Sequence, residues 1–339
     1  RRRRRSLRIR DKLCKSTYLF SRESVRSIKT QQKAYDVIRV IDLTHIVASC
    51  CPCSIRQRSR RYFIKPFFMK NPFSLQVQSV LKNIVRDWSD VGAEERKQCY
   101  SPILDAIEER FPPDKYSDRR QVKILVPGAG LGRLAWEISS RGFTCQGNEF
   151  SLFMLFASNF ILNRCPEANI HTVHPWVHQY VNHVTCEHQI HGVQFPDVRV
   201  AAPRPDKHFS ITAGDFLKVY TERDEWSCVA TCFFIDCAPN VIEFVERIHA
   251  ILKPGGYWIN LGPLLYHYRE NTGDIVYFIS CSQKEQTGVK TKYAQNPNSM
   301  MQNEYDSVFF CFDWLAIDRQ HYYSSQTTKP LAGLSHSAL

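Results

Sequence analysis

Four polar side chains stand where this sequence predicts the ends of apolar strands: Glu149, Asp215, Asp236 and His267. Carboxylates at the carboxyl ends of parallel strands can accept hydrogen bonds from a ribose, and such strand ends are where ligands bind in a sheet of this kind. A turn with almost no side chains, Gly128 to Gly132, precedes the first acid and lets the backbone approach a ligand closely. These residues indicate a nucleotide-type cofactor beside a polar reaction site.

The stretch from Val122 to Glu149 must position the first acid. Its pattern predicts a strand over Val122–Val126, a helix over Leu131–Ser140 and a second strand over Phe143–Gly147. Glu149 then lies just past the second strand, 21 residues after Gly128, which is the spacing of a ribose-binding acid in a βαβ unit.

The glycine turn has three interpretations. It could be only a structural turn, or it could bind the pyrophosphate of a dinucleotide, which usually needs G-x-G-x-x-G. Here the glycines are Gly128, Gly130 and Gly132, a G-x-G-x-G spacing with nothing basic inside the turn. This form resembles motif I of the class I methyltransferases, which bind S-adenosylmethionine, a ligand without phosphate.

Strands and helices continue to alternate after Glu149, which predicts an α/β fold with a Rossmann-like, doubly wound sheet. Further strands are expected at Phe209–Ala213, Trp226–Ile235, Tyr257–Leu261, Ile275–Ser280 and Ser307–Leu315, and helices at Phe150–Asn163 and Ala238–Leu252.

Composition divides the chain. Residues 1–72 hold 20 basic and 4 acidic side chains, a net of +16, while the remainder has a net of −4. The basic extension could be a nuclear-localisation or nucleic-acid arm, but we favour a disordered tail or a wrongly predicted exon. We expect a helical cap over 73–120, a methyltransferase domain over 121–315 with an insertion at 165–207, and a polar tail over 316–339.

The thirteen cysteines, an odd number, favour a reducing compartment, so we expect the cytoplasm, the nucleus or both. No run of 18 apolar residues predicts a membrane span. Cys50 to Cys53 forms a C-x-x-C without a second pair, and the insertion carries six histidines without fixed acidic or thiolate companions. We therefore predict no metal site and favour a substrate-side lid for the insertion.

Residues 75–311 resemble the carnosine N-methyltransferase family. The resemblance rests on long runs in the same order: VRDWSDVGAEERKQCYSPI, ILVPGAGLGRLAWEI, QGNEFSLFMLFASNFILNRC, HPWVHQ, FPDV, TAGDF, CFFIDCAPNVI and ILKPGGYWINLGPLLYH. It implies a class I methyltransferase that uses S-adenosylmethionine to methylate the imidazole of carnosine, giving anserine, and possible action on related dipeptides.

The resemblance also implies roles for single residues. Those implied to bind the cofactor are Asn83, Arg86, Gly128, Glu149, Asp215, Phe216 and Cys232. Those implied to hold the dipeptide are Asp236, His267 and Tyr305, with Asp236 also catalytic. From the residues alone, Asp236 could equally be the N-cap of the helix that begins near Ala238.

Two other functions compete with the dipeptide methyltransferase. The same fold could methylate a protein or RNA, with the basic arm as a docking element, or it could be a non-catalytic relative with an altered C-terminal region. The near-neutral body argues against nucleic acid except through the arm, and the intact Asp236 and His267 argue against loss of activity. The expected partners are a small dipeptide and, as a further possibility, a second copy of the chain, with no membrane.

Overall fold

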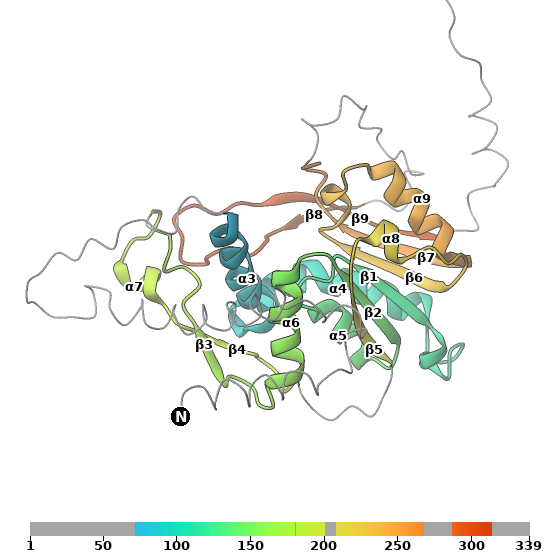
Figure 1. Ribbon diagram of the computed structural model, residues 1–339, viewed down its shortest axis with the longest axis horizontal. Helices are drawn as coiled ribbons and strands as arrows, with labels where there is room; N and C mark the ends of the chain where they lie inside the picture. Colours follow the sequence, from blue (N-terminus) through green and yellow to red (C-terminus); the bar gives the residue numbers. More distant parts are fainter. Residues whose placement is uncertain (1–71, 180, 201–207, 268–286, 314–339) are drawn as a thin grey trace, which may run out of the picture.

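The computed structural model describes residues 72–179, 181–200, 208–267 and 287–313. In these residues a seven-stranded sheet with the order β5-β2-β1-β6-β7-β9-β8 forms the centre of the fold (Figure 1). Its strands are β1 (Lys123–Pro127), β2 (Thr144–Glu149), β5 (Phe209–Ala213), β6 (Trp226–Cys232), β7 (Leu252–Gly262), β8 (Thr287–Thr291) and β9 (Tyr305–Asp313).

The sheet is mostly parallel. Strands β5, β2, β1, β6 and β7 pair in parallel, whereas β9 runs antiparallel to both β7 and β8. Since the chain starts in the middle of the sheet and builds outward in both directions, the predicted doubly wound α/β fold is confirmed. The carboxyl ends of β1, β2, β5, β6 and β7 therefore meet at one edge, where such sheets bind ligands.

Helices cover both faces of the sheet because its buried strands alternate their side chains between two cores. On β1, Ile124 and Val126 pack with α4 (Ala93–Arg110) and α5 (Arg133–Ser140), while Leu125 points to the opposite face. That opposite face is covered by α8 (Phe216–Val219) and α9 (Val241–Ile251).

A third apolar cluster joins the cap to the insertion. Helix α3 (Pro72–Trp88) and the short helix η1 (Asp90–Gly92) pack with α6 (Leu152–Arg164) and a small antiparallel sheet of β3 (His171–Val173) and β4 (Val193–Phe195). Trp88 and Phe195 are both fully buried there. The insertion thus begins with a packed unit, which also contains α7 (Cys186–Ile190) and lies at one end of the molecule (Figure 1). A lid role for it stays a prediction.

The structure moves several predicted boundaries. Strand β6 ends at Cys232 instead of Ile235, because Phe233 takes a left-handed conformation with φ of 51° and leads into η3 (Ile235–Cys237). Strand β2 continues through Glu149, so this acid is the last residue of the strand.

Two elements at the C-terminal side differ from the prediction in other ways. Strand β8 was not predicted, because it lies at the sheet edge and its side chains are mostly exposed, which removes the apolar signal. The predicted strand Ile275–Ser280, residues 1–71 of the basic extension and the tail 316–339 lie outside the described residues.

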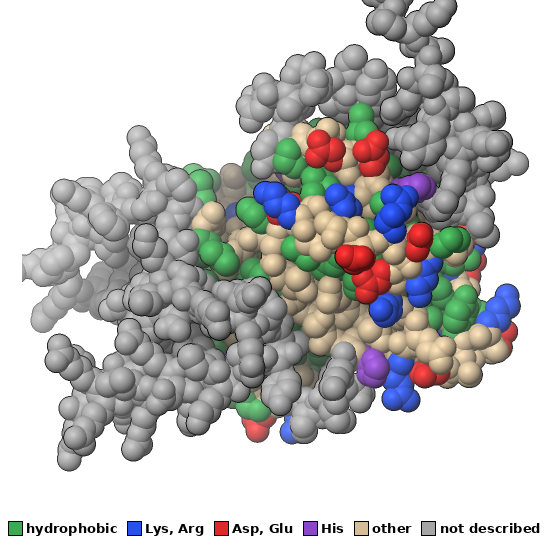
Figure 2. Space-filling view, turned by 45° about the vertical axis from the view of Figure 1, so that its right-hand side comes forward, with side chains coloured by type: hydrophobic (Ala, Val, Ile, Leu, Met, Phe, Trp, Pro, Cys, Tyr) green, Lys and Arg blue, Asp and Glu red, His purple; other side chains and the backbone are tan. Residues whose placement is uncertain are grey.

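The surface of the domain is mixed in charge. On the face shown in Figure 2, basic and acidic side chains are interspersed over the described part of the chain. Within that part, no helix combines the length and the apolarity that a membrane span requires.

Candidate functional site

The glycine turn and Glu149 form one hydrogen-bonded unit at the carboxyl ends of β1 and β2. The Glu149 carboxylate accepts from the backbone N–H of Gly130 at 2.8 Å and from that of Ser151 at 2.7 Å. The Ala129 N–H also donates to the Asn148 carbonyl, at 2.8 Å. Each carboxylate oxygen has more than one lone pair, so both retain capacity for ribose hydroxyls.

Burial affects the protonation of this acid. It raises the pKa of Glu149, while the hydrogen bonds from the backbones of Ser151 and Gly130 act in the opposite direction. The same two backbone hydrogen bonds hold the carboxylate of this predicted ribose-binding acid in place before any ligand binds.

The turn needs glycine at three positions. Gly128, Gly130 and Gly132 have φ values of 66°, 55° and 84°, a region that residues with a Cβ rarely adopt. A Cβ on Gly128 would lie 2.5 Å from the Phe234 ring. The predicted turn thus depends both on backbone conformation and on close packing against the segment that follows β6.

Asp215 and Phe216 begin the short helix α8, at the end of β5. Asp215 accepts a hydrogen bond from the backbone N–H of Leu217 at 3.1 Å and so caps this helix. The Phe216 ring is buried among Phe234, Phe244 and Tyr220. The contact of Asp215 and Phe216 with the cofactor stays a prediction.

Arg86 reaches the same edge of the sheet from the last turn of α3. Its Nη1 donates to Asp87 at 2.8 Å and to the Tyr100 hydroxyl at 2.7 Å, and its Nη2 lies 3.9 Å from the Cys232 sulfur. The guanidinium also lies over the ring of Tyr293, 4.7 Å from its centroid. The structure therefore brings two predicted cofactor residues, Arg86 and Cys232, together from positions 146 apart in the chain.

The third predicted residue on this side, Asn83, is engaged by the protein. Its amide nitrogen donates to the Ser79 carbonyl at 2.9 Å, and its oxygen accepts from the Tyr293 hydroxyl at 3.1 Å. Sequence reasoning did not identify Tyr293, Tyr100 or Asp87. Asp87 lies next to Arg86 and could have been found, whereas Tyr293 comes from a polar segment far along the chain.

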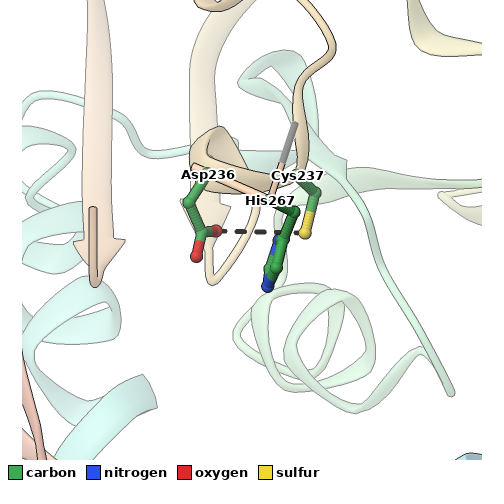
Figure 3. A group of neighbouring side chains, drawn as sticks. All are labelled: Asp236, Cys237 and His267. Carbon is green, nitrogen blue, oxygen red and sulfur yellow. Dashed lines mark hydrogen bonds between the residues drawn. The ribbon is translucent and has the colours of Figure 1, made fainter. Parts of the chain in front are cut away.

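Asp236 and His267 meet just beyond the ends of β6 and β7. The His267 N–H donates to the Asp236 carbonyl at 2.9 Å, and the Asp236 and His267 side chains project toward the same space (Figure 3). Burial raises the pKa of Asp236, and the positive charge of His267 opposes this change. The N-cap interpretation of Asp236 is wrong, because Asn240 caps α9 through a hydrogen bond from Ile242.

Cys237 adds a thiol to this pair. Its sulfur lies 3.9 Å from the Asp236 carboxylate (Figure 3). Cys237 as a whole residue is exposed, but desolvation of its sulfur, followed by the negative charges of Asp236 and Glu149, raises the pKa of the thiol to about 12. The sequence analysis gave this residue no role, although it directly follows Asp236.

Tyr305 is the first residue of β9, and its ring packs on Phe233, which in turn contacts Arg86 and Tyr293. The two rings pack edge to face with centroids 6.1 Å apart, and Phe233 also packs on Tyr293 at 4.8 Å. Phe233, with its left-handed backbone, therefore lies between the predicted substrate residue Tyr305 and the Arg86 cluster.

These residues fit S-adenosylmethionine. The side-chain-free turn leaves room for a close ligand, Glu149 offers acceptors for a ribose, and the Nε of Arg86 is buried without a partner among the described residues. An unpartnered buried donor is costly unless a ligand satisfies it. The mostly parallel sheet, the G-x-G-x-G turn and the strand-end acid together define a class I methyltransferase.

A model of the carnosine N-methyltransferase family matches residues 67–314, which is most of the chain. The chain therefore belongs to the carnosine N-methyltransferase family. It is 52% identical over 253 residues to the Drosophila melanogaster protein named carnosine N-methyltransferase unmet, an alignment that covers 70% of this chain and 54% of that protein. The Mus musculus carnosine N-methyltransferase is 47% identical over 248 residues, covering 69% and 62%.

Solved structures are more distant. The Haemonchus contortus phosphoethanolamine N-methyltransferase 2, in complex with S-adenosyl-L-methionine, has a TM-score of 0.31 at 16% identity and covers 53% of this chain and 35% of that one. A putative S-adenosyl-L-methionine-dependent methyltransferase of Methanococcus maripaludis has a TM-score of 0.32 at 14% identity, covering 62% and 68%. Such weak likenesses assign neither ligand nor substrate. This chain spans 54% to 62% of the two curated relatives named above.

Proposed function

We propose that this chain transfers a methyl group from S-adenosylmethionine to the imidazole ring of carnosine, β-alanyl-histidine, giving anserine, and that it accepts related histidine dipeptides. The observation that carries the proposal is the pairing of Asp236 with His267 beside the glycine turn and Glu149. Membership of the family supports the same reaction.

The cofactor would be held from two sides. The backbone of the turn Gly128 to Gly132 and the Glu149 carboxylate face it at the ends of β1 and β2, and Arg86 and Cys232 face it from α3 and β6. When bound, S-adenosylmethionine supplies a methyl group on a positively charged sulfur. The protein then has to align a nucleophile with the carbon–sulfur bond.

The nucleophile needs little help from a general base. Imidazole has an ordinary pKa of about 6.5, so its neutral form prevails at pH 7. In this proposal the Asp236 carboxylate accepts a hydrogen bond from one ring N–H, which leaves the lone pair of the other ring nitrogen free to attack. The same carboxylate stabilises the positive charge that develops on the ring as the new bond forms.

The remaining substrate residues would place the rest of the dipeptide. His267 lies beside Asp236, and Tyr305 lies across Phe233 from the Arg86 cluster. His267 lies in the segment after β7 and Tyr305 is the first residue of β9, so both can contact the β-alanyl end or the carboxylate without disturbing the sheet.

The direct test is a methylation assay on the purified chain with labelled S-adenosylmethionine and, separately, carnosine, free histidine, histidine peptides and RNA. The proposal expects label on the dipeptide imidazole. Transfer to RNA or to protein in place of carnosine would support the docking-arm alternative, and no transfer at all would support a non-catalytic relative.

A variant tests the chemical step. Asp236→Asn keeps the size but removes the charge, and its amide can donate to the wrong ring nitrogen. Loss of one such charge-stabilising contact typically slows a reaction by about a hundredfold, or roughly 3 kcal/mol. Single-turnover kinetics should show this loss while a cofactor titration remains near wild type. Asp306→Asn, at an exposed position on β9, is the matched control.

The proposal extends to partners and location. We expect no contact with nucleic acid by the described body, where charges of both signs are interspersed on the face in Figure 2.

A homodimer is a separate possibility that sedimentation of the purified chain would test. The eight free cysteines of the described residues suit the cytoplasm or nucleus, which fluorescence imaging of a tagged chain would examine.

A further inference from the structure

Asp236, Cys237 and His267 place three different metal-binding atoms close together. A carboxylate oxygen, a thiol sulfur and an imidazole nitrogen from these residues all lie within 4.8 Å of one another. Figure 3 shows the three side chains projecting into the same space from η3 and from the segment after β7.

The backbone holds these groups in this arrangement. Asp236 and Cys237 are consecutive in the short helix η3, and the hydrogen bond from the His267 N–H to the Asp236 carbonyl fixes the third residue beside them. Asp236 is buried, whereas Cys237 and His267 are exposed. The cluster is therefore buried on the side of Asp236 and open to solvent on the side of Cys237 and His267.

The ligand set selects a chemical class of ion. Calcium and magnesium prefer oxygen ligands, whereas one sulfur, one nitrogen and one oxygen suit zinc and similar divalent transition metals. Zinc bonds of about 2.0 to 2.3 Å in a tetrahedral site place ligand atoms roughly 3.3 to 3.8 Å apart. The observed separations thus need side-chain adjustments of only about 1 Å to reach that geometry.

We infer that Asp236, Cys237 and His267 form an open three-ligand site for Zn²⁺ or a similar transition metal ion. The site overlaps the pocket proposed for the dipeptide, because Asp236 and His267 belong to both. A bound ion occupies the carboxylate and imidazole that would hold the substrate, so metal and dipeptide exclude each other. Metal binding stands on the cluster alone, while the competition rests on the proposed function.

Cys237 is the residue that distinguishes the two uses of the pocket. The substrate proposal assigns work to Asp236 and His267 and none to the thiol. Three protein ligands with a fourth position open to water are the usual arrangement of accessible zinc sites. Replacing the thiol by a serine hydroxyl removes the soft ligand but keeps a donor beside the Asp236 carboxylate, so Cys237→Ser should weaken metal binding and still methylate the dipeptide.

The binding test uses Co²⁺ as a spectroscopic probe on the full chain, compared with Cys237→Ser and with Cys186→Ser. Cys186 is an exposed cysteine in α7 and serves as the matched control. We expect a thiolate-to-cobalt absorption band of equal intensity in wild type and in Cys186→Ser. In Cys237→Ser the intensity of this band should fall by the contribution of one thiolate ligand. Contributions of cysteines outside the described residues are common to all three proteins and cancel in the comparison.

Affinity is measured by competition with a chromophoric zinc chelator, and Cys237→Ser should bind the pocket ion at least tenfold more weakly than wild type. Circular dichroism confirms that the variant is folded, and Cys237→Ala provides a second variant if serine disturbs η3. An unchanged cobalt spectrum and unchanged zinc affinity in folded Cys237 variants would overturn the site.

The activity test separates this inference from the proposed function. Zn²⁺ should inhibit wild-type methylation, added carnosine should relieve the inhibition, and Cys237→Ser should need at least tenfold more Zn²⁺ for the same effect. Inhibition that carnosine does not relieve would refute the overlap. If no form methylates carnosine but the cobalt band still depends on Cys237, the proposed function fails and the metal site stands.

Discussion

Asp197 is a residue whose removal should clearly destabilise this fold. Its carboxylate accepts from Arg133 Nη1 at 2.5 Å and from Arg96 Nη2 at 2.6 Å, and its side chain is only 5% exposed. Arg133 is the first residue of α5, directly after the glycine turn, and Arg96 also donates to the Arg86 and Ser89 carbonyls at the end of α3. One carboxylate thus ties the insertion to both the turn and the cap.

The expected cost follows from this burial. Removing one partner of a buried ion pair typically costs about 3 to 5 kcal/mol, because the remaining charge is left uncompensated. Asp197→Asn keeps one acceptor oxygen, so we expect the lower end, about 3 kcal/mol. For a domain of this size each kcal/mol lowers Tm by roughly 2 to 4 °C, which gives a loss of about 6 to 12 °C.

Thermal unfolding followed by circular dichroism measures this loss. The matched control is Glu225→Gln, which breaks the ion pair with Lys123 at 3.2 Å, where both side chains are at least 40% exposed. Exposed pairs contribute about 0 to 1 kcal/mol, so this variant should unfold close to wild type. If Tm falls no further in Asp197→Asn than in Glu225→Gln, the ion pairs of Asp197 with Arg133 and Arg96 do not hold the insertion to the turn.

Three further predictions concern the site and its surroundings. Gly128→Val should abolish cofactor binding, since its Cβ would lie 2.5 Å from the Phe234 ring at a φ of 66°, and Glu149→Ala should weaken it at least tenfold; calorimetry with S-adenosylmethionine on folded variants checks both. Deleting residues 1–70, nearly all of which precede the family match, should leave dipeptide turnover largely unchanged, and a folded but inactive truncation would make the extension part of the enzyme. Burial raises the pKa of Asp236, so the ionised carboxylate lowers the stability of the folded protein as the pH rises through the folded-state pKa. Asp236→Asn should therefore have a higher Tm than wild type at pH 7, and this difference should shrink as the pH falls toward about 4. Tm measurements of both proteins across that pH range would show or refute this change.

The sequence predicted best those elements that one local pattern determines. Strand β5 matches the predicted range Phe209–Ala213 at both ends, because apolar and polar residues alternate over a short stretch that ends at Gly214. The turn between β1 and α5 was predicted from its glycines alone, and the structure shows why: three left-handed residues occur within five positions. Such features depend on backbone sterics, which the residue type reports directly.

Elements that depend on tertiary contacts were harder to predict. The helix after β6 was expected to begin near Ala238, yet it begins at Val241 behind the cap of Asn240, because the chain first turns through Phe233 and η3. As a result Asp236 lies in η3 and not at the N-terminus of α9. A left-handed phenylalanine has no sequence signature, so the boundary could not be read from propensity.

The arrangement around Arg86 shows why the site was only partly predictable. Its partners Tyr100, Cys232 and Tyr293 come from a helix, a central strand and the segment after an edge strand, and no spacing rule relates them. The fold brings them together because the last turn of α3 and the segment that joins β8 to β9 both reach the carboxyl end of β6. The cap is therefore part of the site itself: α3 supplies the buried Arg86 guanidinium, and Trp88 at its end donates to the Leu131 carbonyl inside the glycine turn at 3.1 Å.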